Sequence, residues 1–331
     1  MSLERPAKKG NKYINTIPTD EAGFDKMLPI MREYMRNKSE GIPAKTLGPF
    51  NTDASVYNTP PQNGLRITLV GHSSLLIEID GYTILTDPVW SDRVSFTQLM
   101  GPKRFFKPPI ALADLPPIDA VICSHDHYDH LDMATIRFFA GSSIPFYCSL
   151  GVGQYLEKWG IIKNYITEMD WGDSVMLAHD CVITAAPARH FSGRGILNRN
   201  ETLWSSFIIK GPKHNIYFGA DSGWHPQFEE IGETYGPFDL TMLEIGAYGK
   251  YWPDIHMGPN HASNAHLALK GKIMMPIHWG TFNLALHDWY EPIELLIEYA
   301  REKNIELFVP EPGKPTEVNG PFNSEWWRKF M

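Results

Sequence analysis

The amino-acid sequence predicts an α/β protein in which two mixed β-sheets are flanked by helices. Short β-rich runs without intervening helices come first, at residues 65–70, 73–79 and 82–86. From residue 120 onward, strand-like runs alternate with stretches of helical period. A meander followed by alternating strands and helices is typical of mixed sheets with helices outside. The 331 residues, 43% of them hydrophobic, suffice for one large domain with an N-terminal extension.

The first 60 residues are expected to form an arm, a helix and a linker that pack on a core domain of residues 61–331. Residues 1–18 are polar and basic, which predicts a loose arm. Apolar residues at helical spacing predict a helix within residues 20–38, which Pro29 weakens or kinks. The linker that follows is rich in Pro, Gly and Asn and is expected to be irregular.

Turns and helices then divide the core domain. Gly71 and the Asp80-Gly81 pair mark the two turns of the meander. Strands are predicted at 120–124, 181–187, 215–219 and 273–277, and helices at 133–140, 227–235 and 264–269. The aromatic C-terminus, which contains Trp326 and Trp327, is expected to dock on this core.

The composition of the chain limits which partners the protein can bind and in which cell compartment it is expected. The formal net charge of −8 offers no global basic surface, so no nucleic-acid partner is expected. Cys123, Cys148 and Cys181 are odd in number and lie in apolar stretches, which predicts buried free thiols. The N-terminal segment has no long apolar stretch, and no run of 18 apolar residues occurs. These features predict a cytoplasmic protein.

The most informative segment is residues 125–130, which reads His-Asp-His-Tyr-Asp-His. Five of its six residues carry a carboxylate or an imidazole, and both groups bind divalent cations. The segment follows the apolar run at 120–124, so it lies where a strand ends and a loop begins. Open α/β sheets hold their ligands at this edge. The sequence therefore predicts a metal site here.

Further metal-binding residue types follow other strand-like runs. These are His190, Asp221 and His278, with Asp87 behind them. If the strands end at one edge, their side chains converge on one cleft. Seven such groups suit two ions about 3.5 to 4 Å apart that share a bridging carboxylate. Imidazole-rich ligation without Cys favours two Zn²⁺, while Mn²⁺ and Fe²⁺ remain alternatives.

Residues 124–132 resemble the signature motif of the metallo-β-lactamase superfamily. Other segments resemble motifs of one of its branches, which contains the N-acylphosphatidylethanolamine-hydrolysing phospholipase D family and, more distantly, the ascorbate-6-phosphate lactonases. The segments that resemble the phospholipase are 100–105, 115–121, 228–232, 236–240, 245–248 and 277–282. The similarity spans roughly residues 65 to 300. It implies a four-layer αββα sandwich of two mixed β-sheets flanked by helices, and makes residues 61–331 a hydrolase domain.

The resemblance also implies a role for each site residue. The ligands of one ion are His125, His127 and His190, those of the other are Asp129, His130 and His278, and Asp221 is the bridge. Asp87 is expected to orient a ligand imidazole through a hydrogen bond. His256 matches a histidine that faces the substrate, and the expected catalytic residues are Asp129, Asp221 and His256.

The function that the resemblance implies is a binuclear phosphodiesterase of phospholipase D type, with a metal-bridging hydroxide that attacks a phosphodiester. A lactonase acting on a phosphorylated sugar lactone is the alternative, because the same nucleophile attacks a carbonyl. A non-catalytic metal-binding or membrane-docking module is the third hypothesis. Expected partners are a small-molecule or phospholipid substrate, with homo-oligomer formation left open.

Two groups of residues outside the ligand set also suggest contacts. Residues 103–107 and Trp252 place aromatic side chains beside cations or proline, which suggests peripheral contact with a membrane. Arg189, Arg194 and Arg199 are expected to flank the cleft, where a guanidinium can contact phosphate. No ligand role is assigned to the remaining histidines, which are His179, His214, His225, His261, His266 and His287.

Overall fold

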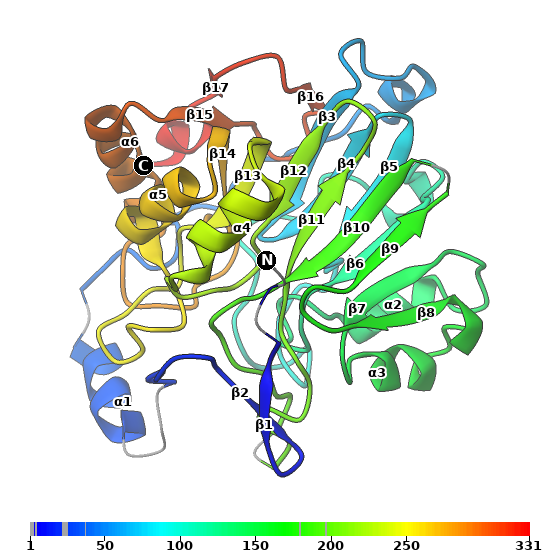
Figure 1. Cartoon of the computed structure of the whole chain (residues 1–331). Coiled ribbons are helices and arrows are strands. Elements are labelled where there is room, and N and C mark those ends of the chain that lie inside the picture. The colour runs from blue at the N-terminus through cyan, green and yellow to red at the C-terminus, as the bar shows by residue number, and fades with distance from the viewer. Residues whose placement is uncertain (1–2, 4, 22–25, 37, 179, 196) are drawn as a thin grey trace.

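The computed structural model describes residues 3, 5–21, 26–36, 38–178, 180–195 and 197–331. Its core is a pair of mixed sheets (Figure 1). In order across the first sheet, the strands are β17 (Phe322–Asn323), β15 (Glu306–Val309), β14 (Gly271–Ile277), β13 (Phe238–Glu244), β12 (Asn215–Phe218), β11 (Ser206–Lys210), β10 (Cys181–Ala186) and β9 (Ser174–Leu177). The second consists of β16 (Thr316–Glu317), β3 (Leu65–Gly71), β4 (Ser74–Ile79), β5 (Tyr82–Thr86), β6 (Ala120–Cys123), β7 (Phe146–Ser149) and β8 (Ile166–Met169).

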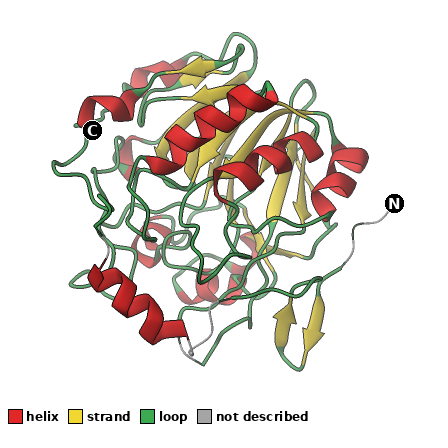
Figure 2. Cartoon of the chain, turned by 90° about the vertical axis from the view of Figure 1, so that its left-hand side faces the viewer, coloured by secondary structure: helices red, strands yellow, loops and turns green. Residues whose placement is uncertain are grey.

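Helices cover the outer face of each sheet. The first sheet packs against α4 (Gln227–Tyr235), α5 (Gly258–Ala268) and α6 (Glu291–Lys303), and the second against α2 (Met133–Phe138) and α3 (Gly153–Lys158). In Figure 2 helices lie across the strands, and loops gather at one end of the molecule. The predicted four-layer αββα sandwich is thus confirmed.

Apolar side chains fill the space between the layers. Ile67 and Ile122 of one sheet meet Ile183 and Ile216 of the other in a shared cluster, and all four are fully buried. Such strands, buried on both faces, require nearly continuous apolar sequence. This explains why runs such as that of β6 can be identified from the sequence alone.

The N-terminal segment is more ordered than its sequence predicts. Residues expected to form a loose arm contain a hairpin of β1 (Ala7–Lys9) and β2 (Lys12–Ile14). Helix α1 spans Met27–Arg36, so Pro29 lies in its first turn. A missing N–H costs no helical hydrogen bond at that position, so Pro29 lies at the start of the helix and not in its interior as expected. Phe24, which contributed to the predicted helix, lies outside the described residues.

Other local predictions can be checked directly. Helix α5 begins at Gly258, six residues before the predicted start, with Pro259 in the first turn where proline is favourable. Cys123, Cys148 and Cys181 are buried free thiols, as predicted. Among the described residues, no helix combines the length and apolar character that crossing a bilayer requires.

The predicted docking of the C-terminal tail is confirmed. Trp326 and Trp327 are almost fully buried in the cluster beneath α6, against Trp279. The Trp327 indole Nε1 donates a hydrogen bond to Glu294 of α6 at 2.6 Å. The tail therefore supports the residue that follows His278.

We expect Trp327→Ala to lower the free energy of unfolding by about 3 to 5 kcal/mol, because it leaves a large cavity in the core. Urea denaturation followed by tryptophan fluorescence and circular dichroism measures the change. Met331→Ala is the control, since Met331 is exposed in the same tail. Equal stabilities of the two variants would contradict the docking.

Candidate metal centre

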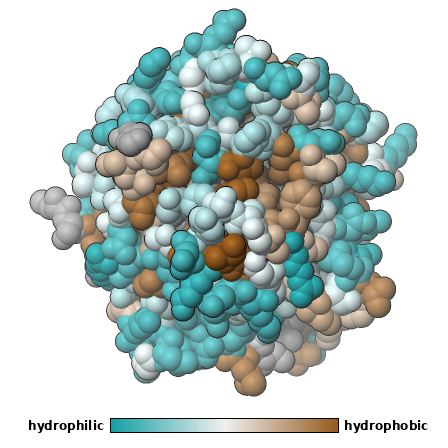
Figure 3. Space-filling view, turned by 90° about the vertical axis from the view of Figure 1, so that its right-hand side faces the viewer, coloured by the Kyte–Doolittle hydropathy of each residue, from teal (hydrophilic) through white to brown (hydrophobic). Residues whose placement is uncertain are grey.

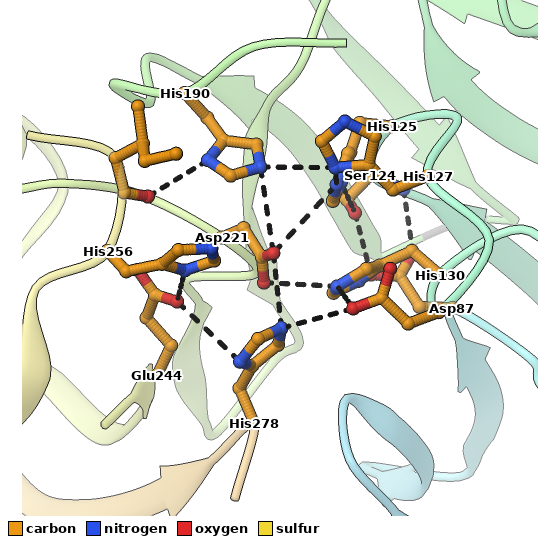
Figure 4. A network of polar contacts seen from close by, with 12 residues as sticks. Asp87, Ser124, His125, His127, His130, His190, Asp221, Glu244, His256 and His278 are labelled. Carbon is orange, nitrogen blue, oxygen red and sulfur yellow. Dashed lines mark hydrogen bonds and ion pairs between the residues drawn. The ribbon is translucent and has the colours of Figure 1, made fainter. Parts of the chain in front are cut away.

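The predicted site residues meet at one edge of the sandwich, where strands of both sheets end (Figure 4). Asp87 follows β5, the 125–130 segment follows β6, and His190 follows β10. Asp221 and His278 follow β12 and β14. Residues between positions 87 and 278 of the chain thus become neighbours, since side chains at the ends of adjacent strands share one edge.

Three imidazoles and one carboxylate form the first group, which consists of His125, His127, His190 and Asp221. The Nδ1 atom of His127 lies 2.9 Å from Nε2 of His125 and 3.3 Å from Nε2 of His190. The Asp221 Oδ2 atom lies 3.9 Å and 3.7 Å from those two Nε2 atoms. Donor atoms around a tetrahedral zinc, with bonds of about 2.0 to 2.1 Å, are about 3.3 Å apart. The spacing therefore fits one ion.

Hydrogen bonds on the outer side define the tautomers in this group. His190 Nδ1 donates to the carbonyl oxygen of Ile255, because a carbonyl only accepts. The Ser124 hydroxyl donates to Asp87 and accepts from His125 Nδ1. Both Nε2 atoms consequently present lone pairs to the interior. Burial lowers the pKa of His125 and His190 well below the usual range, which keeps them neutral and able to bind metal.

Facing lone pairs a few ångströms apart repel one another unless a cation or a proton lies between them. The structure also leaves several inward atoms without a hydrogen bond from any described residue. These atoms are His130 Nε2, His278 Nε2 and Asp221 Oδ1. Buried polar atoms are rarely unpaired in folded proteins. The residues present therefore fit a bound metal.

The second group consists of Asp129, His130, His278 and, unexpectedly, His72. His130 Nε2 lies 3.1 Å from Asp221 Oδ1, and His278 Nε2 lies 3.2 Å from Asp221 Oδ2. Asp221 thus stands between the two groups. Burial lowers the pKa of His278, but the nearby carboxylates of Asp221 and Asp129 outweigh it and raise that pKa to about 10. Protons and metal ions compete for such ring nitrogens.

Asp87 supports both groups from behind and is itself fully buried. Its Oδ1 accepts from the Ser124 backbone N–H at 2.7 Å. Its Oδ2 accepts from the Ser124 hydroxyl at 2.6 Å and from His130 Nδ1 at 2.8 Å. One carboxylate therefore fixes His130 directly and His125 through Ser124, which is the orienting role predicted for it.

His72 was not identified from the sequence. Its Nε2 lies 3.0 Å from Asp129 Oδ2, and its ring packs against His278 with centroids 3.8 Å apart. Burial, assisted by the neighbouring His278, lowers the pKa of His72 to about 3. The position follows Gly71 at the turn between β3 and β4, which in sequence looks like ordinary turn chemistry. The one signal in the sequence that could have identified His72 is a histidine directly after a predicted strand.

Glu244 is the second residue that sequence analysis missed. It is the last residue of β13, is fully buried, and accepts from His256 Nδ1 at 2.6 Å. Backbone N–H groups of Ser222 and Met257 also donate to it. His256 lines the cleft beside His190 and His278, as expected. The signal in the sequence that could have identified Glu244 is a charged residue at the end of the apolar run of β13.

Backbone strain accompanies the site. His72, Asp87, Ala220 and His278 adopt φ values of 59°, 36°, 48° and 62°, a region that non-glycine residues rarely occupy. Each such residue costs about 1 kcal/mol or more, and such strain tends to persist at functional sites. The surrounding hydrogen bonds hold these residues in place.

A cleft of about 470 Å³ opens beside the two groups. His127, Asp129, Asp221 and His256 line it together with apolar side chains, which include Phe191, Trp252, Ile255 and Leu284. A mainly apolar wall with few polar groups is typical of small-molecule sites.

The three arginines expected at the cleft differ in their contacts. Arg189 is bound by Pro18, Thr19, Trp224 and Asp254. Arg194 Nη1 donates to the carbonyl oxygens of Asp126 and Leu131, both at 2.7 Å, and its guanidinium stacks on Tyr128. Only Arg199 of the three lines the cleft, where it pairs with Glu21. The expectation that the three arginines flank the cleft is therefore wrong for Arg189 and Arg194, whose guanidinium groups hold loops together.

The other described histidines lie outside both groups. His214 contacts Asp80, His225 stacks on Phe228, and His266 contacts Thr241. His287 accepts from the backbone of Ala247, and His261 is an exposed residue of α5. His179 lies outside the described residues.

Comparisons with known proteins agree with this geometry. Residues 82–279 match the model of the beta-lactamase superfamily domain. The chain is 48% identical over 335 residues to an uncharacterized protein of Mycobacterium tuberculosis, covering 99% of this chain and 89% of the relative. It is 34% identical over 318 residues to N-acyl-phosphatidylethanolamine-hydrolyzing phospholipase D 1 of Caenorhabditis elegans, covering 90% and 89%.

A solved structure shows the same fold. Igni18, a metallo hydrolase from Ignicoccus hospitalis, superposes with a TM-score of 0.58 at 24% identity, covering 76% of this chain and 97% of Igni18. Together with the family match and the grouped His and Asp side chains, this similarity assigns the chain to the metallo-β-lactamase superfamily, as a metal-dependent hydrolase.

Proposed function

We propose that this hydrolase is a binuclear phosphodiesterase of phospholipase D type. The observation that carries the proposal is the position of Asp221, whose carboxylate oxygens lie 3.9 Å from His125 Nε2 of the first group and 3.1 Å from His130 Nε2 of the second. One carboxylate between two such groups suits a pair of divalent cations, for which two Zn²⁺ are the first choice. The similarity to a phospholipase D over 90% of the chain supports a phosphodiester substrate.

Two bound cations would supply an activated water and Lewis-acid stabilisation of a phosphoryl oxygen. The protein's own residues do the rest. Asp129 and Asp221 line the cleft, where their carboxylates orient the attacking water in line with the leaving group. Glu244 accepts a hydrogen bond from Nδ1 of His256 and so positions the ring beside the cleft, where we propose that it passes a proton to the departing alcohol.

The walls of the cleft support an amphipathic substrate. Phe191, Trp252 and Leu284 offer apolar contact, while Arg199 and its ion-pair partner Glu21 form a polar part of the wall. Apolar side chains also lie exposed elsewhere, for example Phe96 and Leu99, which are 76% and 86% exposed. On the face shown in Figure 3, apolar residues gather among hydrophilic ones near the middle. Such patches would suit peripheral contact with phospholipid.

We expect Asp221→Asn to abolish hydrolysis of bis(p-nitrophenyl) phosphate, with kcat reduced more than about 100-fold, because the amide loses the charge that two cations would share. Asp114→Asn is the matched control, since Asp114 is exposed on a short 3-10 turn and belongs to neither ligand group. Metal content by elemental analysis and circular dichroism accompany the assay. Wild-type turnover by a folded Asp221→Asn variant would contradict the proposal.

We expect Asp87→Asn to weaken metal binding by about 10 to 100-fold, the usual effect of losing a hydrogen bond to a ligand imidazole. His130 Nδ1 donates a hydrogen bond to Asp87 and needs an acceptor there, whereas the asparagine amide can present an N–H in its place. Competition with a chromogenic chelator measures the affinity, and Asp114→Asn again serves as control. An unchanged affinity would mean that Asp87 does not orient the ligands.

A substrate panel tests the reaction class. Metal-loaded protein is assayed with N-acylphosphatidylethanolamine in mixed micelles, with a phosphodiester and with sugar-phosphate lactones. We expect turnover of the lipid and the phosphodiester, which a chelator removes and added zinc restores. Turnover of lactones alone would replace the phosphodiesterase by the lactonase.

A further inference from the structure

A buried arginine outside the metal centre has no hydrogen-bonding partner for its charge among the described residues. Arg104 belongs to residues 103–107, the segment whose aromatic side chains were expected to face a membrane. Phe105 and Phe106 instead pack into the core at 6% and 3% exposure, while Lys103 and Lys107 are exposed. That membrane expectation is therefore wrong for the aromatic residues, and Arg104 itself is only 6% exposed.

The guanidinium of Arg104 is surrounded by few polar groups. Its Nε, Nη1 and Nη2 atoms are buried and donate no hydrogen bond within the described part of the chain. Asp132 and Asp92 are the charged groups that act on the guanidinium electrostatically, and neither accepts a hydrogen bond from it among the described residues. Its ring contact is with Phe282, 5.4 Å from the ring centroid. Burial lowers the pKa of Arg104 to about 10, which still leaves it charged near neutral pH.

A buried, unpaired guanidinium is unfavourable, because the desolvated charge and its N–H donors are uncompensated. Arginine presents these donors in a planar fork that matches the paired oxygens of a phosphate or carboxylate. The unpaired fork thus indicates a ligand of opposite charge.

The surroundings of Arg104 favour an anion. It lines a groove of about 730 Å³ together with four other cationic side chains, which are Lys45, Arg93, Lys103 and Lys107. Asp92 is the one carboxylate among the described residues that line this groove. The chain as a whole carries a formal net charge of −8, so this concentration of positive charge is local. Such clustering raises the local concentration of anions.

The groove is distinct from the metal centre. Its described lining residues include none of the metal-ligand candidates. Phe282 separates the two regions, because its ring contacts Arg104 on one side and His72, at 5.2 Å between centroids, on the other. His72 in turn contacts Asp129, so an occupant of the groove lies two side chains from the second ligand group.

We propose that Arg104 is the centre of a second site, which binds a phosphate-type oxyanion. The fork of Arg104 holds two oxygens of the anion, and Lys103 and Lys107 add charge at the mouth of the groove. The anion is supplied either as free phosphate or as the phosphate of a lipid headgroup. Neither the metals nor the hydrolytic reaction is needed for this binding.

Thermal unfolding of the metal-loaded protein in a chloride buffer, with and without inorganic phosphate, tests the proposal. Without phosphate, Arg104→Met is expected to melt at the same temperature as the wild type or higher, because methionine fills similar space without a buried charge. Saturating phosphate is expected to raise the Tm of the wild type by about 2 °C or more beyond that of Arg104→Met. Phosphate bound at the metal centre affects both proteins equally and cancels in this difference.

Arg93→Met is the matched control, because Arg93 lines the same groove but already donates to the carbonyl oxygen of Gly101. It should keep the wild-type phosphate response. If it loses the response as fully as Arg104→Met, general groove charge and not the buried fork binds the anion, and the assignment to Arg104 is overturned. The assignment also fails if Arg104→Met melts below the wild type by a constant amount at every phosphate concentration.

A second arm separates the two sources of phosphate. Wild type and Arg104→Met are co-sedimented with phosphatidylcholine vesicles, with and without phosphatidic acid. Binding that depends on phosphatidic acid and is lost in the variant identifies a lipid headgroup. Equal vesicle binding together with the phosphate-dependent Tm difference identifies free phosphate. Absence of any difference between the two proteins in both arms overturns the site.

Discussion

The site depends on one electrostatic constraint, the close approach of imidazole lone pairs and carboxylates in a buried place. His125, His127 and His190 bring three ring nitrogens into close contact, with His127 Nδ1 at 2.9 and 3.3 Å from the other two. Without a positive charge between them, that arrangement is repulsive and poorly solvated. The fold holds it because outer hydrogen bonds and packed strands leave these side chains no alternative orientation.

Those outer hydrogen bonds connect segments that are distant in the chain. Asp87 after β5 orients groups of the β6 loop, the Ile255 carbonyl orients His190, and Glu244 of β13 orients His256. Arg194 also stabilises the 126–131 loop, because its guanidinium donates hydrogen bonds to the carbonyl oxygens of Asp126 and Leu131. Because each orienting group comes from a different strand or loop, the site forms only when both sheets have paired.

The distribution of charge divides the molecule into functional regions. Carboxylates and imidazoles gather where cations fit, whereas the unpaired Arg104 and its neighbouring lysines gather where an anion fits. Phe282 and His72 lie between the regions in direct contact. This proximity gives a physical route by which an anion in the groove can influence the position of Asp129.

The sequence by itself determined the layers of the fold and the set of candidate ligands. Apolar runs such as that of β6 mark strands buried on both faces, and the 125–130 segment carries its chemistry in consecutive residues. Only the tertiary structure decided the roles of His72, Glu244 and Arg104, and the different uses of Arg189, Arg194 and Arg199. The contacts of these residues are with partners far away in the chain. A histidine in a turn or an arginine in a loop carries no local sequence signal that shows which partner it contacts after folding, or that it has none.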